Sequence, residues 1–120
     1  SNLTSLNEKP KVAPDTEVKD VLLEISKKML GVTAAIENDK IVGIITDGDL
    51  RRMMSKTDTF KGLMAKDIMT KNPKTIQNEA MAVEAMEVMD TFGITQVLAE
   101  DNGVYSGVVH IHNLTKEGII

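Results

Sequence analysis

The sequence predicts an α/β fold in which one unit of helix, strand, strand and helix occurs twice. Three observations support this. Short segments recur in the same order about 64 residues apart, each copy opens with apolar residues at helical spacing, and each continues with two short apolar strands around a polar turn. Because one copy of about 60 residues would bury little surface alone, we expect the copies to pack as a pseudo-twofold pair.

The repeat is visible in three pieces of sequence. "GIITDGDL" at 43–50 matches "GVVHIHNL" at 107–114, so that Gly43 and Leu50 align with Gly107 and Leu114 at an offset of 64. "LGVTAAI" at 30–36 resembles "FGITQVL" at 92–98 at an offset of 62, which predicts small length changes in two connections. The apolar positions of the first helix recur at an offset of 64 residues: Val18, Val21, Leu22 and Ile25 match Ala82, Ala85, Met86 and Met89.

In the first copy, apolar residues at helical spacing predict a helix over about 16–30, with Asp15 or Thr16 as N-cap and Gly31 as C-cap. "VTAAIE" predicts a buried strand, "NDK" a turn and "IVGII" a second strand. "DGDLRRMM" then begins a second helix, with Thr46 or Asp47 as its cap. A short apolar segment at 11–13 is a further strand candidate.

The second copy follows the same order. We expect a helix over 79–92, a strand over 95–99, a hairpin turn at "EDNG", where Asn-Gly is the strongest local signal, and a strand over 104–109. A short helix is expected near His112, and a strand at 74–76. The polar segment 55–66 predicts a linker or a short irregular helix.

These patterns divide the chain into four parts. Residues 1–9 are expected to be a tag remnant and an N-terminal linker, because Ser1 and Asn2 resemble a cloning remnant. Residues 10–56 form the first predicted domain, 57–66 a linker, and 67–120 the second domain.

Composition excludes several classes of protein. The chain has 14 basic and 18 acidic residues, a net charge of −4, which argues against a nucleic-acid binder. It has no cysteine, which excludes disulfides and thiolate sites. No apolar run approaches the roughly 20 residues that span a bilayer, and no secretory signal opens the chain. We therefore expect a cytoplasmic protein with no membrane partner.

"TDGDLRR" at 46–52 is the most distinctive polar stretch. As an EF-hand calcium loop it fails, because the fifth and twelfth positions counted from Asp47 are Arg51 and Asp58. As an acid–base pair it is weak, since Asp47 and Asp49 point in different directions at a helix start and no nucleophile with a neighbouring base is evident. Two interpretations stay open: capping and helix-dipole compensation alone, or capping together with a bound ligand.

The ligand hypothesis follows from the chemistry of a helix start. Free N–H groups there attract anions. A carboxylate such as Asp49 can accept both hydroxyls of a vicinal diol, Thr46 can donate to a phosphate or ribose oxygen, and Arg51 or Arg52 can pair with a phosphate. Aliphatic strands around 32–36 and 41–45 would flank a base.

Taken together, "GIITDGDL" and "AKDIMTKNPKTI" resemble a cystathionine-β-synthase (CBS) domain pair, and the match covers residues 10–118. "TDGDLRR", "MTKNPKTI" and the His-x-His of "GVVHIHNL" are together similar to the C-terminal CBS pair of the arabinose-5-phosphate isomerases. The resemblance implies an N-terminal sugar isomerase domain in a longer parent chain, acting on the route to the octulosonate sugar of lipopolysaccharide and capsule. It also implies a homodimer formed through the CBS helices.

The predicted ligand residues fall into two sets. Those of the first cleft are Thr46, Asp49, Val32, Thr33, Ile44, Arg51 and Arg52. Those of the second, weaker cleft are Thr95, His110, His112 and Asn113. His110 stands where Thr46 does and Asn113 where Asp49 does, so a diol would be held less firmly there. His110 and His112 could supply two metal ligands, but a site needs a third or fourth, and we predict no native metal.

Three functions are compatible with these features. The first is a regulatory module that binds a nucleotide or a nucleotide-activated sugar, such as an adenine nucleotide or a CMP-sugar, and modulates the isomerase domain. The second is a structural module that helps that isomerase to oligomerise without a ligand. The third, a free-standing enzyme, lacks a catalytic constellation, so we expect no catalytic residues and no required cofactor in this chain.

Overall fold

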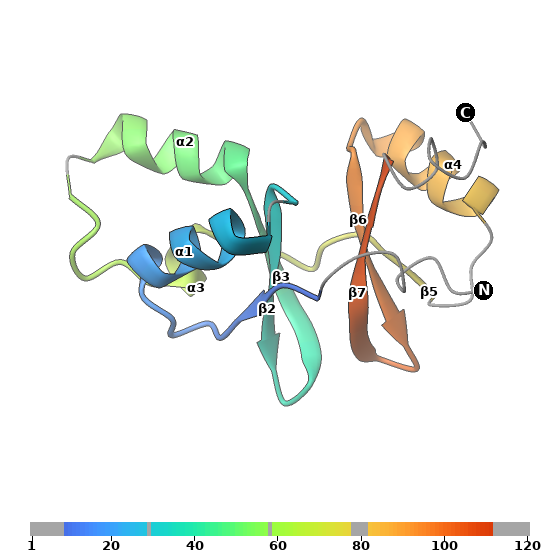
Figure 1. The fold of residues 1–120 in the computed structure, drawn as a ribbon, viewed down its shortest axis with the longest axis horizontal. Coiled ribbons are helices and arrows are strands. Elements are labelled where there is room, and N and C mark those ends of the chain that lie inside the picture. The colour runs from blue at the N-terminus through green and yellow to red at the C-terminus, as the bar shows by residue number, and fades with distance from the viewer. Residues whose placement is uncertain (1–8, 29, 58, 78–81, 112–120) are drawn as a thin grey trace. The chain divides into compact units, whose positions relative to one another are not determined.

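The computed structural model describes residues 9–28, 30–57, 59–77 and 82–111. The chain divides into two compact units, residues 10–73 and the segment from residue 74 onward together with Lys9. Figure 1 shows a mixed arrangement of helices and strands in each of them.

The first unit is built on a four-stranded sheet of order β1-β2-β3-β4. β1 (Lys11–Val12) runs parallel to β2 (Val32–Glu37), and β2 is antiparallel to β3 (Lys40–Thr46). β3 is in turn antiparallel to β4 (Thr70–Lys71). The hairpin between β2 and β3 turns at Asn38 and Asp39, which both have positive φ, as a type I′ turn requires.

Three helices complete this unit: α1 (Val18–Lys28), α2 (Asp47–Lys56) and α3 (Ala65–Ile68). Their apolar faces share one core with β3. Its buried residues are Val18, Val21, Ile25, Ile45, Leu50, Met53 and Ala65. α1 and α2 both follow a helical repeat of apolar residues, so each buries one face and exposes the other.

The segment before α3 is fixed to the start of α1 by backbone hydrogen bonds. Leu63 O accepts from Val18 N–H at 3.0 Å, and Ala65 N–H donates to Thr16 O at 2.8 Å. Lys66 N–H donates to Pro14 O at 2.9 Å. The residues from Leu63 to Lys66, in the second half of the predicted linker, are therefore hydrogen-bonded to the first unit.

The second unit has a three-stranded sheet of order β5-β6-β7. β5 (Thr75–Gln77) is parallel to β6 (Gln96–Asp101), which is antiparallel to β7 (Val104–His110). The Asn-Gly turn predicted from the sequence is confirmed. Asn102 and Gly103 both have positive φ, of 51° and 88°, as in a type I′ turn.

One helix, α4 (Ala82–Phe92), is described in the second unit. It ends in a Schellman motif: Gly93 has φ 63°, its N–H donates to Asp90 O, and Ile94 N–H donates to Met89 O at 2.9 Å. The core beneath it is formed by Ile76, Ala85, Met89, Val97, Ala99 and Val109.

The structure confirms the α/β class and the duplication, and it corrects the register of the repeat. A bulge follows Ala35 in β2 and Ala99 in β6, and Gly43 and Gly107 pair with these two alanines. Ala35 and Gly43 each stand 64 residues before their counterparts Ala99 and Gly107, so the offset of 62 predicted for 30–36 is wrong. That offset came from Gly31 and Gly93, which both have positive φ but stand at different places in the turn from helix to strand.

Most predicted elements are present with shifted ends. The first helix is shorter than 16–30, and α4 is described from Ala82, so 79–81 lie outside the described residues. Of the segment 55–66, the first two residues belong to α2 and the last two to α3. β4 was not predicted. The helix expected near His112 lies outside the described residues.

Candidate ligand site at the start of α2

The first turn of α2 is closed by a capping box between Thr46 and Asp49. Thr46 Oγ1 accepts from Asp49 N–H at 3.2 Å, and Thr46 N–H donates to Asp49 Oδ2 at 2.9 Å. The Thr46 hydroxyl also lies 3.2 Å from the same Oδ2. Thr46 is therefore the N-cap, and Asp47, the other cap candidate, is the first helical residue.

The Asp49 carboxylate is enclosed and has a cationic partner. Its side chain is 10% exposed, whereas that of Arg52, one turn along α2, is 67% exposed. Arg52 Nη2 donates to Asp49 Oδ1. The two carboxylate oxygens thus have different roles. Oδ2 accepts the Thr46 N–H at the start of α2, and Oδ1 accepts the guanidinium N–H of the exposed Arg52.

Asp49 and Arg52 lie in the wall of a pocket of about 370 Å³ between α2, the segment after it and α3. The pocket has an apolar part, formed by Met53, Leu63 and Ile68, and a polar part that includes Lys56 and Asp67. Volumes of about 300–1,000 Å³ are typical of small-molecule sites. A ligand with hydroxyls, an anionic group and an apolar face would meet matching groups here.

The other residues predicted for the first site lie on both faces of the sheet. Val32 pairs with Thr46 and Ala34 with Ile44, so Val32, Ile44 and Thr46 share one face. Thr33 pairs with the core residue Ile45 and lies on the opposite, helix-covered face. Val32 and Thr33 are fully buried, and Thr33 Oγ1 has no hydrogen-bond partner within the described chain.

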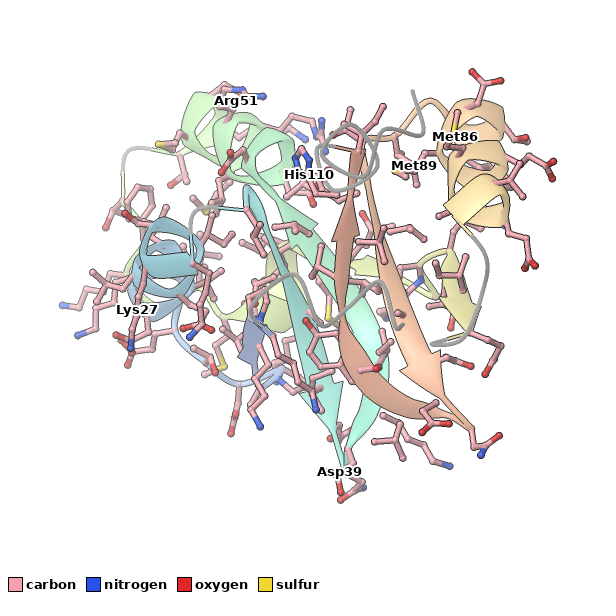
Figure 2. The ribbon with its side chains drawn as sticks, turned by 45° about the vertical axis from the view of Figure 1, so that its right-hand side comes forward. Lys27, Asp39, Arg51, Met86, Met89 and His110 are labelled. Carbon is pink, nitrogen blue, oxygen red and sulfur yellow. The ribbon has the colours of Figure 1, made fainter. Side chains whose placement is uncertain are left out.

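The two adjacent arginines differ in their surroundings. Arg52 contacts Asp49, whereas Arg51 lies exposed on α2, where Figure 2 labels it. Of the seven residues predicted for the first site, Asp49 and Arg52 are the two among the residues lining the pocket. Thr46 does not line the pocket, but its hydrogen bonds to Asp49 fix the position of that carboxylate.

In the second unit, two of the predicted residues are described. His110 pairs with Gln96 at the end of β7. Thr95 O accepts from Ile111 N–H at 2.8 Å, and Thr95 Oγ1 donates to Gln96 Oε1. The bond from Ile111 to Thr95 repeats that from Asp47 N–H to Gly31 O. His112 and Asn113 lie outside the described residues, so the structure does not show the counterpart of Asp49.

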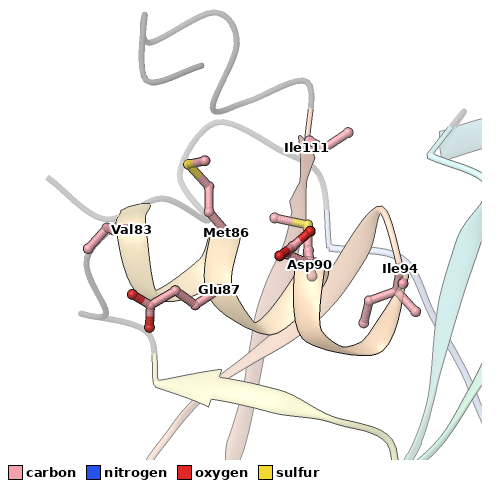
Figure 3. A pocket seen from close by; sticks show the side chains of 8 residues that line it. Val83, Met86, Glu87, Asp90, Ile94 and Ile111 are labelled. Atoms are coloured by element: carbon pink, nitrogen blue, oxygen red, sulfur yellow. The ribbon is translucent and has the colours of Figure 1, made fainter.

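A second pocket, of about 380 Å³, runs along α4 and is mostly apolar. Figure 3 shows Met86, Ile94 and Ile111 around it, and the acidic side chains of Glu87 and Asp90 also line it. The matching region of the first unit also has a pocket, of about 420 Å³, and Leu50 of α2 lines it; the counterpart of Leu50, Leu114, lies outside the described residues. We assign no ligand to this pocket.

The helical spacing of Met81, Met86 and Met89 predicts that they fill the core. Met89 is 2% exposed and belongs to the core of the second unit, as predicted. Met86 packs against that core while also lining the pocket on α4, and Figure 2 labels both residues on this helix. Met81 lies outside the described residues.

Two further properties of the described residues bear on function. Nowhere in that part of the chain do three His, Asp or Glu side chains gather as metal ligands would. None of its helices has the length and hydropathy needed to cross a membrane.

The family model of the CBS domain matches residues 5–56 and 65–119, one match for each copy of the repeat. The chain belongs to the CBS domain family. Its two matches identify it as a CBS pair, and they leave out the segment 57–64.

Similar sequences come from longer proteins. The chain is 44% identical over 112 residues to arabinose 5-phosphate isomerase KdsD of Francisella tularensis, which covers 92% of this chain and 34% of that protein. It is 36% identical over 112 residues to KdsD of Yersinia pestis, with 92% and 34% covered. This CBS pair therefore spans about a third of the length of the curated relatives it matches.

Solved structures with the same fold are also CBS proteins. The CBS domain protein NE2398 superposes with a TM-score of 0.86 at 20% identity, covering 100% of this chain and 98% of that one. PAE2072 from Pyrobaculum aerophilum, solved in complex with AMP, has a TM-score of 0.83 at 21% identity, covering 95% and 90%. These similarities show the fold.

The sequence did not single out Lys56 and Asp67, which line the pocket with Asp49. Both had a signal. Lys56 stands four residues after Arg52 and so on the same face of α2. The spacing from Met64 to Asp67 repeats that from Thr46 to Asp49, and Met64 N–H donates to Asp67 Oδ2 at 2.9 Å.

Proposed function

We propose that this CBS pair is a regulatory module that binds a nucleotide or a nucleotide-activated sugar. It would modulate an attached sugar-phosphate isomerase domain that interconverts ribulose 5-phosphate and arabinose 5-phosphate. The observation that supports this most directly is the pocket beside α2, where an enclosed carboxylate, two cationic side chains and an apolar wall occur together.

The chemistry of this pocket suits a ribose or sugar phosphate. Asp49 is held rigidly by the capping box, so an acceptor oxygen is already placed for a diol. Arg52 and Lys56 can pair with phosphate oxygens. Met53, Leu63 and Ile68 offer contact to a base or to the apolar face of a sugar ring.

Related proteins support both halves of the proposal. PAE2072 was solved with AMP, and the CBS pair of MJ0100 was solved with 5′-methylthioadenosine and S-adenosylmethionine. These ligands all contain a ribose diol. KdsD proteins, named as arabinose 5-phosphate isomerases, are about three times as long as this chain. An isomerase domain in the parent protein would explain that difference, and a cytoplasmic location is part of the same proposal.

Two observations favour a second function, a structural module that assists assembly of the isomerase without binding a ligand. Both Asp49 oxygens already have partners within the first unit. Large apolar side chains are also exposed on α1, α2 and α4: Leu23, Met54, Val83 and Phe92. These would suit contact with another protein surface.

Thermal unfolding with added ligands separates the two functions. We would measure the melting temperature with AMP, ATP, CMP and CMP-activated octulosonate. A ligand at 100 times its dissociation constant stabilises the folded state by about 2.7 kcal/mol, enough for a shift of several degrees in a domain of this size. Absence of a shift with all four would favour the structural module.

Two variants define the site. Asp49→Asn keeps the shape of the side chain but removes its charge, and it should weaken any shift. Asp47→Asn is the matched control, because Asp47 lies in the same helical turn and does not line the pocket. Equal shifts in the two variants would place the ligand elsewhere.

A further inference from the structure

We infer that Arg52 selects for phosphorylated ligands by exchanging its partner, from the Asp49 carboxylate in the free protein to a ligand phosphate in the complex. The inference rests on the proposed function, because it concerns the same pocket. It begins with an asymmetry: Asp49 is almost enclosed, while Arg52, which contacts it, is mostly exposed.

The two oxygens of Asp49 are not equally available. Oδ2 accepts from Thr46 N–H at 2.9 Å and lies 3.2 Å from the Thr46 hydroxyl, so releasing it would open the first turn of α2. Oδ1 accepts from Arg52, whose long side chain can move away without changing the backbone. A ribose hydroxyl that approaches Asp49 therefore competes with Arg52 for Oδ1.

This competition has different consequences for neutral and anionic ligands. A nucleoside removes Arg52 from its counter-ion and gives it no replacement. A nucleoside monophosphate supplies both the hydroxyls for Asp49 and a new anion for the guanidinium. Lys56 lines the same pocket one turn further along α2 and adds a second positive charge, while Asp67 adds a second carboxylate. The preference for an anionic ligand therefore rests on the exchange of Arg52 and not on the net charge of the pocket.

Arg51 provides an internal control for this inference. It carries the same charge on the neighbouring position of α2 and is also exposed. It is not among the residues that line the pocket, and Asp49 has Arg52 as its ion-pair partner in the described chain. A general effect of positive charge would be the same for both arginines, whereas partner exchange requires Arg52.

The test is calorimetric titration of the whole chain and of its Arg52→Gln and Arg51→Gln variants. The probes are AMP against adenosine, and CMP and CMP-activated octulosonate against cytidine. We expect Arg52→Gln to weaken phosphorylated probes at least tenfold and to bind the nucleosides more tightly, because Oδ1 has lost its competitor. Arg51→Gln should match the unaltered chain. Circular dichroism confirms that each variant is folded.

Each outcome separates one explanation from the others. If Arg52→Gln weakens the phosphorylated probes but leaves nucleoside binding unchanged, Arg52 only contacts phosphate and partner exchange is wrong. If both kinds of probe bind as before, the inference fails while the proposed function stands. If none of the five probes binds the unaltered chain, both are overturned.

Discussion

At the scale of single residues, the Thr46–Asp49 pair has a structural task that does not depend on any ligand. The Thr46 hydroxyl satisfies one free N–H at the start of α2, and the Asp49 carboxylate satisfies the N–H of Thr46. The sequence left two interpretations open, capping alone and capping together with a bound ligand. The structure is compatible with both, since the capping box uses one carboxylate oxygen and leaves the other to an exposed side chain.

Replacing Thr46 by Ala should destabilise the chain by about 1 kcal/mol, the usual cost of removing an N-cap hydroxyl. Denaturation by urea would measure it as a lower midpoint with an unchanged slope. Thr46→Ser keeps the hydroxyl and is the control. Equal losses in the two variants would mean that the methyl group, rather than the cap, stabilises α2.

Thr33 is a polar residue in an apolar setting, with a buried hydroxyl that has no partner within the described chain. Thr33→Val should stabilise the fold by about 1 kcal/mol, because it removes an unsatisfied polar group and conserves shape. Urea denaturation measures the change, with Thr33→Ser as the control. A loss of stability together with a loss of ligand binding would instead support the role in the ligand site predicted from the sequence.

At the scale of elements, the close approach of β3 to the residue after α3 limits what can replace Gly43. A Cβ atom on Gly43 would lie 2.5 Å from Met69 Sδ and 2.9 Å from Met69 Cγ. Gly43→Ala should therefore displace Met69, which packs against the core of the first unit, and destabilise it by about 1–3 kcal/mol.

Gly48 is the matched control for Gly43. It lies in the first turn of α2, and the nearest atom to a Cβ there is Arg52 Nη1 at 3.5 Å, an ordinary contact. Gly48→Ala should stabilise the chain by up to about 1 kcal/mol, since alanine favours the helix. Thermal unfolding of both variants would test the pair, and a stable Gly43→Ala protein would contradict the packing described for Met69.

Element order was predictable from sequence because periodicity and turn residues are local signals. The Asn-Gly turn and the two long helices needed no tertiary information. β4 was missed because its two residues form a strand only by pairing with Gly43 and Ile44, far away in sequence. Spacing already favours Arg52 over Arg51 as the partner of Asp49, because residues three apart lie on one face of a helix and residues two apart do not. That Arg52 also lines the pocket depends on tertiary structure, and the sequence did not show it.

At the scale of the whole molecule, the chain is a CBS pair whose two copies differ where a ligand would bind. Unit 10–73 combines an enclosed carboxylate with cationic side chains in one pocket. In the second copy His110 stands in place of Thr46. We therefore expect one strong site per chain, in the first copy.

The homodimer expected from the family resemblance remains a prediction. It would bury exposed apolar side chains such as Leu23 on α1 and Val83 on α4, which are 67% and 55% exposed. Sedimentation equilibrium should show a dimer for the unaltered chain and a monomer for the Leu23→Lys, Val83→Lys double variant. A monomer in both cases would contradict assembly through these helices.

The central claim is that the chain binds an anionic, diol-containing ligand through Asp49. Calorimetric titration with AMP, CMP and CMP-activated octulosonate tests it most directly. At least one should bind with one site per chain, and Asp49→Asn should weaken it ten- to a hundredfold, as expected for a hydrogen bond to a charged group worth about 1.5–3 kcal/mol. Asp47→Asn should leave binding unchanged. Undiminished affinity in Asp49→Asn, or no binding of any of the three, would contradict the claim.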